Sequence, residues 1–159
     1  MATASRKSRS NASDTAADAW QYAVGLLARR DRSEHEMRAA LGARGASARI
    51  VTNVIRRLHD LHYLDDRRFA MHVAERAVRR GFGSERVRAE LTQKGIREAW
   101  VEEAVTSTFT DETALARAVC ERRFGADPLP PAQRGKAARF LHGRGFPEGI
   151  VLAILDEGC

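Results

Sequence analysis

A few residue groups in this sequence have types and spacings that could do chemistry. Asp65 and Asp66 are adjacent carboxylates, of the kind that bind a metal ion or exchange protons. A carboxylate at a helix start also accepts hydrogen bonds from backbone amides and interacts favourably with the helix dipole, so the favoured interpretation is a helix cap. His59 and His62 are possible zinc ligands, but no cysteine pair accompanies them, and we predict neither a metal nor another cofactor.

Nucleophilic and phosphate-binding motifs are weaker still. Ser33 and Ser84 stand at predicted helix starts, and no Ser–His–Asp grouping accompanies them. The segment Arg134-Gly135-Lys136 lacks the upstream glycine and the following Ser or Thr of a phosphate-binding loop. We therefore predict that the protein is not an enzyme, a prediction that a metal in the purified protein would reopen.

The basic residues are the remaining surface signal. The chain carries 27 Lys and Arg against 21 Asp and Glu, a net charge of +6. Arginine binds phosphates and carboxylates in a two-point fashion, so recurring arginines suit a nucleic acid or an acidic protein partner. For any single residue, solubility and compensation of a helix dipole are the competing explanation. The candidate binding residues are Arg29, Arg30, Arg38, Arg44, Arg79, Arg80, Arg88, Lys94, Arg122, Arg123, Arg139 and Arg144.

These cations recur because the sequence repeats itself every 50 residues, as the spacing of Gly45, Gly95 and Gly145 shows. Arginine pairs fall at the predicted end of each first helix, and a cation precedes each of the three glycines. Self-similarity with this period is typical of repeated supersecondary units. Apolar residues share the same columns in each copy: Met37, Val87 and Ala137; Leu41, Leu91 and Leu141; Val51, Val101 and Val151.

The apolar spacing within each copy is helical, with residues at i, i+1, i+4 and i+5, and no segment alternates as a strand would. We predict an all-α fold, an elongated and curved array of three tandem three-helix repeats. A disordered basic tail (1–13) precedes repeats at 14–64, 65–110 and 111–159. The predicted helices are 14–30, 33–44, 47–61, 66–80, 84–94, 97–109, 111–124, 131–143 and 147–156.

Residues at the predicted helix boundaries agree with this scheme. Ser33 and Glu36 form a capping box, and Asp65 and Asp111 suit helix starts. The three periodic glycines suit the left-handed residue that closes a helix. Of the two cysteines, Cys120 falls within a helix and is expected to be buried and inert, although a disulfide with the terminal Cys159 stays open. The aromatic residues mostly fall on apolar helix phases and are interpreted as core.

Several segments, in order, resemble the RecX family of recombination regulators. They cover most of the chain, from about residue 16 to 155. One departure concerns His62, which stands where the family usually has glycine and where a left-handed backbone would cost about 1 kcal/mol. The segments are Ala28 to Met37 (ARRDRSEHEM), Tyr63 to Ala70 (YLDDRRFA), Arg79 to Gly83 (RRGFG), Arg88 to Ile96 (RAELTQKGI) and Arg139 to Phe146 (RFLHGRGF).

The resemblance implies a cytoplasmic, non-catalytic and cofactor-free regulator. Family members bind the filament that the RecA recombinase forms on DNA, and mostly damp its ATP hydrolysis and strand exchange in recombination, DNA repair and the SOS response. Partners are thus expected to be RecA and, through the arginines, single- or double-stranded DNA. Neither a membrane partner nor self-association is expected. A stand-alone helical nucleic-acid-binding protein is the alternative function.

Overall fold

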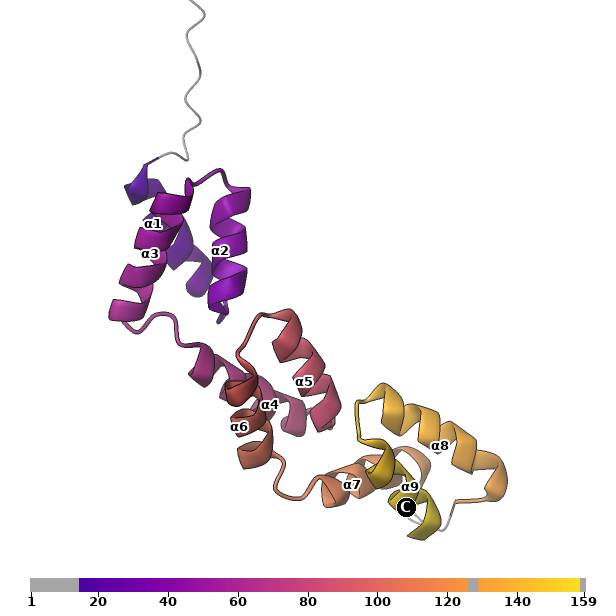
Figure 1. Cartoon of the computed structure of the whole chain (residues 1–159). Coiled ribbons are helices and arrows are strands. Elements are labelled where there is room, and N and C mark those ends of the chain that lie inside the picture. Colours follow the sequence, from indigo (N-terminus) through magenta and orange to yellow (C-terminus); the bar gives the residue numbers. More distant parts are fainter. Residues whose placement is uncertain (1–14, 126–128, 158–159) are drawn as a thin grey trace, which may run out of the picture. The chain divides into compact units, whose positions relative to one another are not determined.

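The computed structural model describes residues 15–125 and 129–157. Over these residues the chain forms nine helices and no strand (Figure 1). It divides into two compact units, one through Asp65 and one from Asp66, which we describe separately. The helices are α1 (Ala16–Leu27), α2 (Glu34–Ala43), α3 (Ala48–Asp60), α4 (Asp66–Arg79), α5 (Ser84–Gln93), α6 (Glu98–Thr108), α7 (Glu112–Phe124), α8 (Pro131–Gly143) and α9 (Glu148–Glu157).

Repeat 1, formed by α1–α3, is the N-terminal unit. The buried faces of its helices meet in one core, in which Met37, Leu41 and Leu58 are fully buried. Ser33 and Glu36 form the predicted capping box at the start of α2, where each side chain accepts a hydrogen bond from the other's backbone amide. Local capping and burial of one helical face therefore specify this repeat together.

Repeat 2, formed by α4–α6, begins the C-terminal unit. Helix α4 packs against both α5 and α6. Their core contains Phe69, Val73, Val87, Leu91 and Val105, all buried. Since Val87 and Leu91 occupy the columns of Met37 and Leu41 in repeat 1, the predicted periodicity of buried positions is confirmed here.

Repeat 3, formed by α7–α9, completes the C-terminal unit. Its core again places the periodic Leu141 with Phe146 and Ile154 in the interior. The Asp111 carboxylate accepts from the Ala114 amide at 2.9 Å, which confirms the predicted cap of α7. Cys120 is fully buried as expected but is disulfide-bonded, so the expectation of an inert thiol there is wrong.

Left-handed backbone occurs where the sequence predicts it. Gly45, Gly95 and Gly145 have φ values of +94°, +71° and +82° and follow the last residues of α2, α5 and α8. His62, after α3, has φ +55° in place of glycine. The predicted first helix is too long at its C-terminus, because α1 ends at Leu27. The predicted tail 1–13 and Cys159 lie outside the described residues.

Candidate partner-binding surface

Two cations of repeat 1 that were predicted to bind a partner, Arg30 and Arg38, are engaged with acids of the same repeat. Arg30 forms a two-point contact with Glu36, with N···O distances of 2.9 and 3.3 Å. Arg38 donates to Glu34 at 2.6 Å, and His59 Nε2 lies 2.7 Å from the other oxygen of that carboxylate. Burial raises the pKa of Glu34, but the hydrogen bonds from Arg38 and His59 outweigh it and hold that pKa below its ordinary value.

Repeat 2 uses two of its predicted cations in the same way. Arg88 on α5 makes a two-point contact with Glu102 on α6, at 2.9 and 2.7 Å. This hydrogen bonding lowers the pKa of the Glu102 carboxyl. Arg79 lies 3.8 Å from Glu75 one turn earlier on α4. Exposed ion pairs of this kind are screened by solvent and contribute little to stability, so their main effect is to orient the side chains.

Cations at the ends of the second helices are in equivalent sequence positions but contact different groups. Arg44, Lys94 and Arg144 are the C-cap residues of α2, α5 and α8. The Arg44 guanidinium lies over the Tyr22 ring, 4.5 Å from its centroid, and the Lys94 ammonium lies 5.7 Å from that of Phe69. Both ring contacts stay within one repeat, whereas Arg144 reaches from repeat 3 into repeat 2.

Repeats 2 and 3 meet end to end through the backbones of α8 and α5. The Gly83 amide donates to the Arg144 carbonyl at 2.9 Å, and the Glu85 amide donates to the Gly145 carbonyl at 3.0 Å. The negative C-terminal end of one helix therefore satisfies the unpaired amides at the positive N-terminal end of another. A Cβ atom on Gly83 would overlap the Gly145 carbonyl oxygen, so glycine permits this approach.

Helix α7 completes the same junction. Its first-turn residue Glu112 accepts a hydrogen bond from the Ser84 amide at 2.6 Å, which supplies another acceptor at the start of α5. Gly81 has φ +70°, and a Cβ atom added there would lie 2.8 Å from a methyl group of Val119 on α7. The segment between α4 and α5 is thus held by groups from two helices of repeat 3.

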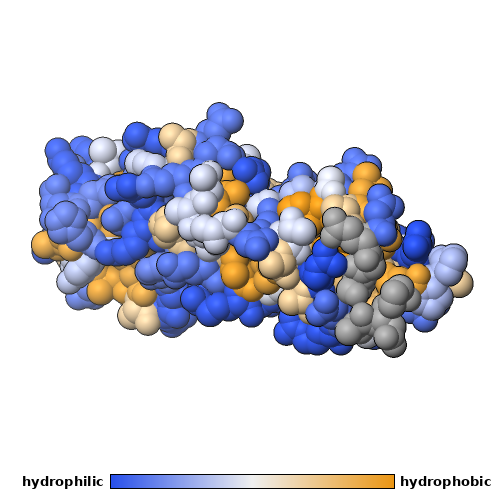
Figure 2. Space-filling view, turned by 90° about the horizontal axis from the view of Figure 1, so that it is seen from below, coloured by the Kyte–Doolittle hydropathy of each residue, from blue (hydrophilic) through white to orange (hydrophobic). Residues whose placement is uncertain are grey.

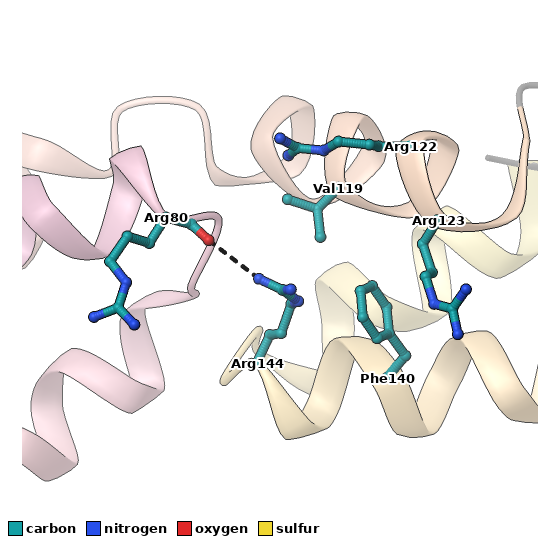
Figure 3. Close-up of a pocket in the computed structure, with 6 residues that line it drawn as sticks. All are labelled: Arg80, Val119, Arg122, Arg123, Phe140 and Arg144. Carbon is teal, nitrogen blue, oxygen red and sulfur yellow. Dashed lines mark hydrogen bonds between the residues drawn. The ribbon is translucent and has the colours of Figure 1, made fainter.

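The Arg144 side chain fixes the end of α4 to the end of α8. Its Nη1 donates to the carbonyl oxygens of Arg80 and Gly81, both at 3.1 Å, and Figure 3 shows the first of these bonds. The guanidinium also lies 4.8 Å from the Phe140 ring centroid and 5.3 Å from that of Phe82. Arg144 is therefore held in a defined orientation although it is only partly buried.

A pocket of about 360 Å³ opens beside Arg144 between repeats 2 and 3. Arginines of three helical regions line it: the residue after α4, the last turn of α7 and the end of α8. Figure 3 shows that the Arg80 guanidinium points away from Arg144, and it lies 5.1 Å from the Phe82 ring centroid. No acidic side chain is among the described residues that line it. The lining residues are Arg80, Val119, Arg122, Arg123, Phe140 and Arg144.

The structure brings together only part of the predicted binding set. Within the C-terminal unit, the arginines of the pocket share one site, whereas Arg79 and Arg88 are paired with carboxylates elsewhere. Arg29 and Arg139 are exposed and lie outside the pocket. Sequence reasoning missed the pocket walls and the role of Glu112. The closely spaced Gly81 and Gly83 were the available signal, because paired glycines often mark a close backbone approach.

Hydrophilic residues dominate the face seen in Figure 2, with hydrophobic residues in small patches among them. In the described part of the chain, no helix has the length and apolar character needed to cross a membrane. No group of three or more potential metal-ligating side chains occurs among residues 15–125 and 129–157.

These features define an all-helical protein of three tandem three-helix repeats with clustered surface arginines. Models of the first, second and third three-helix domains of RecX match residues 19–58, 65–105 and 110–155, in that order. The chain belongs to the RecX family.

Relatives and solved structures agree with this assignment. The regulatory protein RecX of Cronobacter sakazakii is 39% identical over 144 residues, covering 83% of this chain and 87% of the relative. RecX of Salmonella paratyphi A is 38% identical over 136 residues, covering 78% and 81%.

Two crystal structures share the fold. That of RecX from Lactobacillus salivarius has a TM-score of 0.71 at 20% identity, covering 89% of this chain and 95% of the other. A second, of a regulatory protein RecX, has a TM-score of 0.75 at 22% identity, covering 89% and 73%. The predicted fold class of tandem three-helix repeats is confirmed, and the relatives are named as regulatory proteins.

Proposed function

We propose that this chain binds the RecA–DNA filament and modulates it, mostly by inhibiting ATP hydrolysis and strand exchange during recombination and DNA repair. The observation that carries the proposal is the match of three RecX domains, in order, across residues 19–155. The resemblance drawn from the sequence implies the same partner. The site of action would then be the cytoplasm, where RecA assembles on DNA.

A binding protein of this kind needs no catalytic group. It shifts a filament between states by contacting one state better than another. Capped helices and fully buried cores give the repeats defined surfaces from which exposed cations project. Such cations are complementary to acidic protein side chains and to DNA phosphates. The arginines of the pocket are the strongest candidates for partner contact, since acids of the chain engage several of the others.

The experiment is a titration of the purified chain into RecA turning over ATP on single-stranded DNA. We expect ATP hydrolysis to fall as the chain approaches stoichiometric amounts. The double variant Arg122→Glu/Arg123→Glu should need at least about tenfold more protein for the same effect, because two favourable charge contacts become repulsive. Unchanged helical circular dichroism would show that the variant is folded. No effect of the wild-type chain on RecA would contradict the proposal.

The alternative is a stand-alone nucleic-acid-binding protein, which the arginine pocket favours as a specific observation. It predicts tight, salt-sensitive binding to bare DNA. That binding without any change in RecA activity would select the alternative.

A further inference from the structure

We infer that the outward face of α3 in repeat 1 reads base sequence in the major groove of duplex DNA. Recognition of base sequence goes beyond the proposed function, because it requires no RecA. The face, named here the α3 outer face, consists of five exposed residues, Arg49, Thr52, Asn53, Arg56 and Arg57.

Repeat 1 presents α3 in the way that a helix-turn-helix motif presents its recognition helix. Helix α3 packs against α1 and α2 (Figure 1), and the turn between α2 and α3 has four residues, 44–47, among them Gly45. A turn of three or four residues, often with a glycine, joins the two helices of this motif, and its second helix enters the major groove. The buried side of α3, which includes Val51 and Leu58, packs into the core and leaves the α3 outer face exposed.

The equivalent helices of the three repeats differ in charge. Helix α3 carries three arginines and a single acidic residue, Asp60, at its last position. Helices α6 and α9 each carry three acidic residues and neither lysine nor arginine. The positions of Thr52 and Asn53 are occupied by glutamates in α6. A groove bordered by phosphates attracts α3 and repels the two acidic helices, so charge favours repeat 1 for this role.

The arginines of the α3 outer face differ from those that are paired with glutamates elsewhere in repeat 1. In the part of the chain that the structure describes, no carboxylate forms an ion pair with Arg49, Arg56 or Arg57. The Arg57 guanidinium instead lies over the Trp20 ring, 4.0 Å from its centroid, which orients it without neutralising it. The counter-charge for this face is therefore expected to come from a ligand.

The residue types on the α3 outer face are those that distinguish base pairs. Arginine donates two hydrogen bonds to O6 and N7 of guanine, asparagine pairs with N6 and N7 of adenine, and threonine contacts the thymine methyl group. Arg49, Thr52 and Asn53 lie in the first two turns of α3, the part of a recognition helix that reaches the base edges. Arg56 Nη2 donates to Asn53 Oδ1 at 2.7 Å, which orients the amide and leaves both of its N–H groups to donate.

The test uses the full chain and bare duplex DNA, without RecA. Duplexes with a random centre of roughly 20 base pairs, about two helical turns, are selected for binding. The selected duplex is then compared with a scrambled one of the same composition by fluorescence anisotropy. We expect the wild-type chain to bind the selected duplex about tenfold more tightly or better, since a well-placed base contact discriminates by about that factor. Failure of the wild-type chain to enrich any sequence would overturn the inference.

Asn53→Ala is the sharpest variant, because it removes a base-reading group and no charge. Its affinity for the selected duplex should fall about tenfold, while its affinity for the scrambled duplex and the salt dependence stay unchanged. Arg57→Ala should weaken binding of both duplexes alike and lower the slope of log affinity against log salt by about 1. Gln133→Ala and Arg134→Ala, at exposed positions of α8, are the matched controls and should change neither affinity by more than about threefold.

Two further outcomes would overturn the inference. One is a sequence preference that survives in both Asn53→Ala and Arg49→Ala, with helical circular dichroism unchanged. The other is a set of α3 variants that keep the duplex preference but inhibit RecA less, which would assign the α3 outer face to a protein partner.

Failure of this inference is separable from failure of the proposed function. If the wild-type chain inhibits RecA but selects no sequence, the regulator stands and base reading by α3 falls. If the chain selects a sequence through Asn53 but RecA activity never changes, base reading stands and the proposed function falls.

Discussion

Helices α2 and α8 end in the same two residues and use them differently. Each ends in an arginine C-cap followed by a left-handed glycine, Arg44-Gly45 and Arg144-Gly145. Arg44 stacks on a ring of its own repeat, whereas Arg144 bonds two carbonyls of the neighbouring repeat. The repeated sequence thus specifies how each helix ends, and the neighbouring repeat determines which groups the C-terminal arginine contacts.

The largest expected effect concerns the core. The ends of α2 and α8 can be compared only if the three repeats have equivalent core positions. Leu91 is fully buried, as are Leu41 and Leu141 at the same position of the other repeats. Leu91→Ala should lower the free energy of unfolding by about 2–5 kcal/mol, since it leaves a cavity. Urea unfolding checks this, with Trp100 as the reporter of repeat 2 in a Trp20→Phe background. A change below 1 kcal/mol would mean that the column is not a common core position.

The two closing glycines should differ. Gly145→Ala would place a Cβ atom 2.5 Å from that of Arg86, in addition to the strain of its positive φ. We expect a loss of about 2–4 kcal/mol of unfolding free energy. Gly45→Ala is the matched control and should show the backbone strain, about 1–2 kcal/mol. Urea unfolding measures both losses, in a Trp20→Phe background for Gly145→Ala and in a Trp100→Phe background for Gly45→Ala. Equal losses would mean that the contact between repeats 2 and 3 places no extra demand on Gly145.

The two capping arginines should differ by less. Arg144→Ala removes two hydrogen bonds from a charged donor and should cost about 1–3 kcal/mol. Arg44→Ala removes an exposed cation–ring contact and should cost about 0.5–1 kcal/mol. Amide hydrogen exchange sharpens the result, because only Arg144→Ala should speed exchange at Gly83 and Glu85, whose amides bond to the end of α8. Unchanged exchange at Gly83 and Glu85 would mean that the Arg144 side chain does not hold repeats 2 and 3 together.

The smallest effect concerns pH and belongs to repeat 1. The Glu34 pKa is lowered in the folded chain from its ordinary value of 4.5. Its stabilising contribution is therefore complete above about pH 4.5 and is lost as pH falls through the folded pKa. Glu34→Gln should flatten the acid-side decline in the stability of repeat 1, followed through Trp20 in a Trp100→Phe background. The decline seen through Trp100, in a Trp20→Phe background, should stay unchanged and serves as the control.

Much of the fold was predictable because its signals are local or periodic. The capping box at Ser33 and the cap at Asp111 each depend on residues a few positions apart. The left-handed turns at Gly95 and His62 follow from the repeat and from the family pattern. The end of α1 was missed because Arg29 and Arg30 fit a helical pattern equally well, while Arg30 in fact contacts Glu36 across the turn.

The candidate site was predictable only as a set of cations. Pairing of Arg88 with Glu102 and of Arg79 with Glu75 decides which arginines face a carboxylate. Glu75 lies one turn from Arg79 on the same helix, whereas Glu102 lies on a different helix from Arg88. The sequence contains many other carboxylates at similar spacings, so it does not identify these partners. The placement of Arg80 and Arg122 at the same pocket depends on how repeat 3 docks on repeat 2, for which no periodic signal exists.

The sequence by itself determined the number of repeats, their helices and the residues that each core buries, because these follow from short-range spacing and the exclusion of apolar side chains from water. Only the tertiary structure decided which arginines share a pocket. That outcome depends on the carbonyls of α8 meeting the amides of α5, and on Gly83 and Gly145 allowing two backbones to touch. Contacts between residues some 60 positions apart are set by the docking of whole repeats, and short-range spacing does not specify such docking.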